Sequence, residues 1–69
     1  MREVENLVKM ANQIADNFSF HEDAVDRIAD HLKRFWAPSM REALSAYCAA
    51  GGGDLKPGVR EALDKLGGT

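Results

Sequence analysis

Few side chains in this sequence are of the types that bind metals or act as nucleophiles. His21 and His31 stand ten residues apart, without further ligands at the short spacings typical of zinc sites. Cys48 is the single cysteine, and helical spacing places it on an apolar face, where thiols are usually buried and inert. Gly51 to Gly53 follow a helical pattern and lack the Lys-Ser/Thr pair of a phosphate-binding loop. We therefore predict no catalytic, metal-binding or cofactor-binding residues in this chain.

Arg27, His31 and Arg34 form a basic stripe, because steps of four and three place them on one side of a helix. One interpretation is a solvated face, paired with Asp23 and Asp30 four residues before each arginine. The other is a contact with an acidic patch on a protein partner. Nucleic acid is not an expected partner, because the net charge is −2 and no aromatic residues alternate with the cations.

The elements that must position these residues are helices, because apolar residues recur in steps of three and four along most of the chain. Helices are predicted at about 2–18, 20–36, 38–50 and 57–66. The second is expected to begin near Phe20, because Ser19 and Glu22 have the spacing of a capping box. Pro38 suits the first position of the third, and the three glycines end it. Residues 1–69 are thus predicted to be a single all-α domain, a small helical bundle of three to four helices.

Two large aromatic residues, Phe35 and Trp36, end the second predicted helix. Trp36 is the only tryptophan, so it is either the largest member of the core or the anchor for a partner. A chain this short rarely obtains more than about 3–5 kcal/mol from its core. Its load of aromatic and methionine side chains is large, and interfaces are enriched in such residues. We expect part of the following group to contact a partner: Phe18, Phe20, Phe35, Trp36, Met40 and Tyr47.

The sequence has no segment that predicts membrane insertion or export. No apolar run approaches the roughly 20 residues needed to cross a bilayer. The first residues, Met1 to Glu5, lack the apolar region of a signal peptide and are too acidic for a transit peptide. A lone cysteine also argues for a reducing compartment. We expect a cytoplasmic protein that does not bind membranes.

Several stretches resemble the small delta subunit of NAD-dependent formate dehydrogenases, the cytoplasmic molybdenum or tungsten type. They are LVKMANQIA from Leu7, IADHL from Ile28, the spacing F-W-x-P-x-M from Phe35 and L-x-P-x-V-x-x-A-L from Leu55. The family often has an acidic residue before the proline, where this chain has Ala37. The third helix therefore lacks an N-capping side chain, at a cost of about 1 kcal/mol.

The resemblance implies a non-catalytic accessory subunit that supports assembly or stability of the molybdopterin-bearing large subunit. Molybdopterin, iron–sulfur clusters, flavin and NAD are then expected only on partner subunits, and the isolated chain is free to form a homo-oligomer. An alternative remains open: a stand-alone helical adaptor or small regulator, homodimeric or nucleic-acid binding. Candidate contacts with the large subunit are Lys9, Asn12, Gln13, Arg27, His31, Arg34, Phe35, Trp36, Met40 and Arg41.

Overall fold

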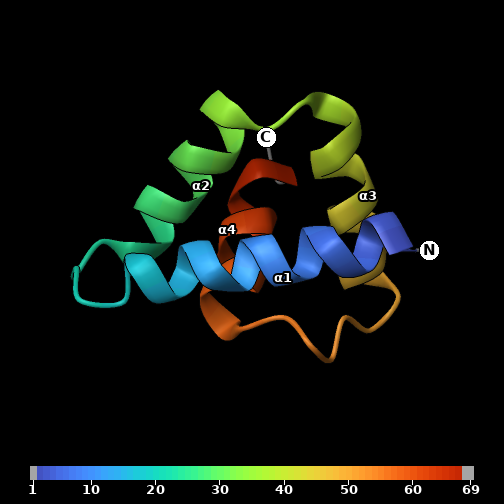
Figure 1. The fold of residues 1–69 in the computed structure, drawn as a ribbon. Helices are drawn as coiled ribbons and strands as arrows, with labels where there is room; N and C mark the ends of the chain where they lie inside the picture. The colour runs from blue at the N-terminus through green and yellow to red at the C-terminus, as the bar shows by residue number, and fades with distance from the viewer. Residues whose placement is uncertain (1, 68–69) are drawn as a thin grey trace.

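The computed structural model describes residues 2–67, and within this range all regular structure is helical. The helices are α1 (Arg2–Asn17), α2 (Ala24–Phe35), α3 (Pro38–Ala49) and α4 (Pro57–Gly67). In Figure 1, α1 crosses in front of α4, with α2 on one side and α3 on the other. The predicted all-α bundle is confirmed.

Each helix contributes an apolar stripe to a common core, and no charged or polar residue is buried among the described ones. The most extensive packing joins α2 to α4. Gly58 allows this close approach, because a Cβ at its position would lie 3.3 Å from Ile28 Cδ1. Lys65 of α4 also pairs with Asp26 of α2 on the surface. The buried residues are Leu7, Val8, Ala11, Ala15, Ile28, Ala29, Leu32, Trp36, Leu44, Leu55, Val59, Ala62 and Leu63.

The second helix begins at Ala24, so the prediction that it begins near Phe20 is wrong. The Ser19 hydroxyl donates to the carbonyl oxygen of Asp16 at 2.8 Å, and thus closes the end of α1 instead of capping α2. Residues 18–23 form turns, in which the His21 amide donates to the Phe18 carbonyl at 3.0 Å. Residues 20–23, which were predicted to be helical, are therefore exposed turn residues between α1 and α2.

The connection between α2 and α3 is short and extended. The amide of Trp36 donates to the Leu32 carbonyl at 3.1 Å and so makes the last bond of α2. Trp36 and Ala37 then have ψ angles of 140° and 150°, and the value for Ala37 is expected because this residue directly precedes Pro38. Pro38 opens α3 as predicted, and Ala37 makes no side-chain capping bond. This change of direction leaves the Trp36 side chain in the core, only 5% exposed.

Glycines end α3, as predicted, and turn the chain into the 50–56 loop, which passes below α1 in Figure 1. Gly51 and Gly52 have φ angles of 131° and 46°, in the region that side chains other than hydrogen rarely allow. A Cβ on Gly52 would also lie 2.9 Å from the Cα of Cys48. Gly52 is therefore required by both its backbone conformation and its surroundings.

Side chains of α1 hold this loop in place. The Asn12 side-chain amide donates to the Asp54 carbonyl at 2.8 Å, and its oxygen accepts the Lys56 amide at 3.0 Å. Lys56 Nζ lies 3.1 Å from a carboxylate oxygen of Asp16. The loop's own Leu55 is buried beneath these contacts. Asn12 thus replaces the secondary-structure bonds that the loop lacks.

Candidate functional site

A row of ring contacts runs from the turn after α1 along the side of α2. The centroids of His21 and Phe18 are 6.1 Å apart, those of Phe18 and His31 6.2 Å, and those of His31 and Phe35 4.8 Å. These separations are typical of aromatic contacts. Phe35 is 72% exposed, and Phe20, which directly precedes His21, is 91% exposed. We refer to the four residues joined by these ring contacts, Phe18, His21, His31 and Phe35, together with Phe20, the exposed sequence neighbour of His21, as the aromatic row.

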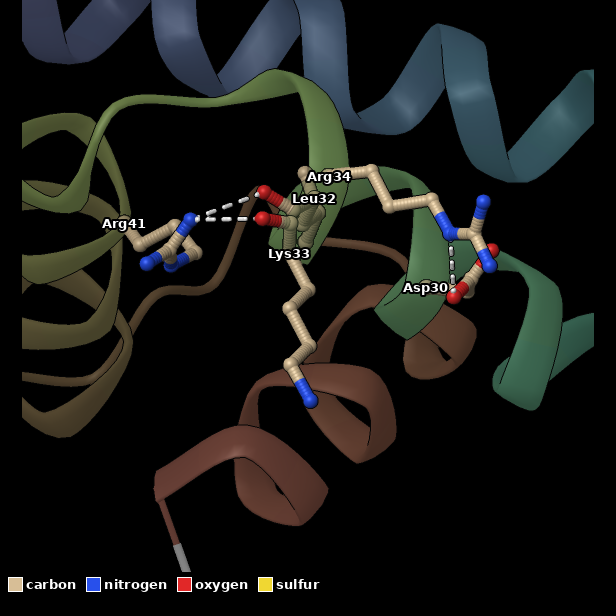
Figure 2. A network of polar contacts seen from close by, with 5 residues as sticks. All are labelled: Asp30, Leu32, Lys33, Arg34 and Arg41. Atoms are coloured by element: carbon tan, nitrogen blue, oxygen red, sulfur yellow. Dashed lines mark hydrogen bonds and ion pairs between the residues drawn. The ribbon is translucent and has the colours of Figure 1, made fainter.

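The backbone at one end of the aromatic row is fixed by Arg41, which reaches across from α3. Its Nη1 donates to the carbonyl oxygens of Leu32 and Lys33, each at 3.1 Å, and Figure 2 shows both bonds. The same nitrogen donates to the carbonyl of Trp36 at 2.7 Å. The Leu32 carbonyl also accepts the Trp36 amide, so Arg41 adds a charged donor at the end of α2 and places a positive charge at the negative end of the helix dipole. Phe35 lies between these bonded residues.

The arginines of the basic stripe are paired within the chain. Arg27 Nε lies 2.8 Å from Asp23 Oδ1, and Arg34 Nε lies 3.0 Å from Asp30 Oδ1, as Figure 2 shows for the second pair. All four side chains are largely exposed. The hydrogen bond from Arg27 holds the pKa of Asp23 below its ordinary value. The pairing expected from the sequence is confirmed, and the charge of the stripe is compensated locally.

The structure brings together only some of the contact candidates. His31 and Phe35 touch, whereas Lys9 and Gln13 are exposed on α1. The amide of Asn12 is occupied by the 50–56 loop, and Trp36 is buried. Met40 is half-buried and lies in a groove between the N-terminal parts of α1 and α3, lined by Glu3, Asn6, Leu7, Ser39, Met40 and Ala43. Arg41 binds backbone of its own chain.

Two exposed apolar residues are absent from the predicted contacts with the large subunit. Phe20 belongs only to the aromatic group of which part is expected to contact a partner, and Met10, which is 44% exposed, belongs to neither set. A signal was present for each. Phe20 falls where the helical pattern breaks, and Met10 lies off the apolar stripe of α1. Nothing in the sequence indicated that Phe18, in the turn after α1, contacts His31 of α2.

Three kinds of side chain in the described part of the chain bear on metal-binding or acid–base chemistry: metal-ligand types, Tyr47 and Cys48. No three His, Cys, Asp or Glu side chains within residues 2–67 lie close enough together to hold a metal ion. The Tyr47 hydroxyl donates to Asp54 Oδ2 at 3.1 Å, and this hydrogen bond raises the pKa of Tyr47. Cys48 is half-buried and free.

No helix in the described part of the chain has the length and apolar character needed to cross a membrane.

Comparison with known proteins gives one match. A family model described as NADH-dependent formate dehydrogenase delta subunit FdsD matches residues 6–63. The matched range contains the whole aromatic row, Arg41 and the 50–56 loop. No curated protein and no solved structure matches the chain.

Proposed function

Because the chain belongs to the FdsD family of NADH-dependent formate dehydrogenase delta subunits, we propose that it is a non-catalytic accessory subunit of a cytoplasmic formate dehydrogenase. It binds the molybdopterin-bearing large subunit and supports the assembly or stability of that subunit. The observation that carries this proposal is the family match, which spans the helices and the turns between them. The molybdopterin, iron–sulfur clusters, flavin and NAD site belong to partner subunits in this proposal.

Such a role needs binding energy and no reactive group. A subunit that binds only the assembled state of its partner stabilises that state by mass action, by about 2.7 kcal/mol at 100 times its Kd. The polar side chains described above support this role, because Arg41 and Asn12 are used to hold backbone and the stripe arginines are paired. Exposed rings on fixed backbone, in contrast, are suited to binding another protein.

The test is a comparison of formate dehydrogenase made in cells with and without this chain. We expect less formate oxidation and less molybdopterin per large subunit in cells that lack the chain, with recovery when the gene is returned. Unchanged activity and cofactor content would contradict the accessory role. The isolated chain supplied with formate and NAD serves as the second arm, and any turnover by it would contradict the non-catalytic assignment.

A further inference from the structure

We propose that the aromatic row is the surface through which this chain docks, and that its occupant is an uncharged apolar groove on the large subunit. This inference rests on the function proposed above and adds to it the docking face and the chemistry of the partner. The contact candidates named from the sequence are spread over three helices. Of these candidates His31 and Phe35 touch, and ring contacts connect them to Phe18 and His21, so that these four residues form one connected surface.

Exposure is the first observation that points to this surface. Among residues 2–67 the large apolar side chains that are exposed are Met10, Phe20 and Phe35, and the two phenylalanines have the greatest exposure. Both belong to the aromatic row, one in the turn before α2 and one at the end of α2. Water contact with whole phenyl rings is unfavourable, and exposed apolar surface of this kind commonly marks a binding site.

Continuity is the second observation. The half-buried rings of Phe18 and His31 contact each other, and they connect the exposed side chains of His21 and Phe35. A partner that covers Phe35 therefore meets His31 at its edge and Phe18 beyond it. The surface is elongated and follows α2, which fits a groove better than a flat patch.

The row is also held in place before any partner binds. Three hydrogen bonds from Arg41 fix the backbone on both sides of Phe35. In the turn, the bond from the Ser19 hydroxyl to Asp16 and the bond from the His21 amide to Phe18 fix the residues around Phe20. Little backbone freedom is then lost on docking, so more of the apolar contact appears as affinity.

The charged residues beside the aromatic row indicate the chemistry of the partner surface that binds it. The cations beside the row, Arg27 and Arg34, are each paired with an aspartate four residues earlier. Each of these pairs has no net charge, so an acidic partner would gain little electrostatic attraction from them. Nucleic acid requires unpaired cations that release counterions, and the chain carries a net charge of −2. We therefore expect the partner surface that contacts the aromatic row to be uncharged and apolar.

The apolar area of the aromatic row favours a larger protein over a second copy of this chain as the partner. A buried phenylalanine contributes roughly 150–250 Å², so the row offers on the order of 400 Å² of apolar surface. A stable interface needs about 800 Å² from each partner. Two copies joined only through the row fall well short of this value. A groove on a larger subunit, which also surrounds the rim of the row, can supply the rest.

The experiment measures binding of three versions of the whole chain to the purified large subunit. They are the wild type, the double variant Phe20→Ser/Phe35→Ser, and the control Lys33→Ser. Lys33 is exposed on the same helix two residues before Phe35, so it points about 200° away from it around the axis. Helical circular dichroism and the fluorescence of Trp36 report whether each variant is folded.

We expect the double variant to keep its helicity and to bind with a Kd at least tenfold higher, as aromatic anchors do, while Lys33→Ser binds as the wild type does. Equal binding by the double variant would overturn the inference but leave the proposed function intact. Failure of the wild type to bind would contradict the proposed function itself. Two further results would identify a different occupant. A homodimer of the isolated chain that the double variant abolishes would indicate a second copy, and binding lost in Arg34→Ser would indicate an acidic partner.

Discussion

Arg41 Nη1 of α3 lies 2.7 Å from the carbonyl oxygen of Trp36, the residue that follows α2. The same nitrogen binds the carbonyls of Leu32 and Lys33, so one guanidinium closes the end of the preceding helix. This relationship connects fold and function. It fixes the turn that directs the Trp36 side chain inward and leaves the neighbouring ring of Phe35 outside.

The loop that follows α3 is held in a similar way. Nη2 of Arg60, from α4, donates to the carbonyls of Gly51 and Gly52 at 2.6 and 2.7 Å. In both cases an arginine from the following helix donates to backbone carbonyl oxygens at or just beyond the end of a helix. A small bundle thereby gains connections between helices without using space in its core.

Replacing Arg41 with alanine should lower the free energy of unfolding by about 1–3 kcal/mol, because backbone carbonyls lose a charged donor. The matched control is Arg34→Ala, which breaks an exposed pair with Asp30 and should cost at most about 1 kcal/mol. Urea denaturation followed by Trp36 fluorescence measures both. Equal losses in the two variants would show that the Arg41 bonds do not stabilise the turn.

Replacing Asn12 with alanine should release the 50–56 loop. Two hydrogen bonds to loop backbone disappear, and we expect a loss of about 1–3 kcal/mol together with faster amide exchange between residues 50 and 56. Gln13, which is exposed on the same helix, provides the control Gln13→Ala. Unchanged exchange in the Asn12 variant would contradict the role assigned to this side chain.

Gly52→Ala should destabilise the fold by about 1–3 kcal/mol, because its φ of 46° strains an alanine and the new Cβ would collide with the backbone of Cys48. Gly53→Ala should change the stability little, since no atom lies within 4 Å of a Cβ at that position. Thermal unfolding distinguishes the two neighbours. A similar melting temperature for both variants would argue against the backbone conformation described for Gly52.

Tyr47 is the only tyrosine, so its ionisation can be followed by absorbance. The hydrogen bond to Asp54 raises its pKa, and we expect a midpoint above the ordinary value near 10. A pKa raised by folding means that the contact stabilises the fold fully below the unfolded pKa and is lost as the pH rises through the folded pKa. Asp54→Asn should move the midpoint back down. An identical midpoint in the variant would contradict the contact.

The sequence was sufficient for most of the helical architecture. Periodic apolar residues placed the helices, Pro38 marked the start of α3, and the glycines marked its end. The start of α2 was predicted wrongly, because the Ser19 hydroxyl can make two kinds of hydrogen bond. It can accept a backbone amide at the start of the following helix, or it can donate to a carbonyl at the end of the preceding one. Spacing fits a capping box, but the Asp16 carbonyl at the end of α1 binds the hydroxyl instead.

The aromatic row was harder to predict from the sequence than the helices were. Phe35 and Trp36 were treated as one aromatic pair, yet they are separated by about 100° at a helix end and have opposite environments. Which of them faces the core depends on the extended conformation of Trp36 and on its contact with Arg41 of the following helix. The apolar spacing along α2 indicates neither of these features.

Binding of the folded, isolated chain to the purified large subunit of a formate dehydrogenase is the most direct test of the accessory role. We expect saturable association, with the two proteins eluting together in size-exclusion chromatography. Absence of a complex, under conditions where circular dichroism shows that the chain is helical, would contradict it.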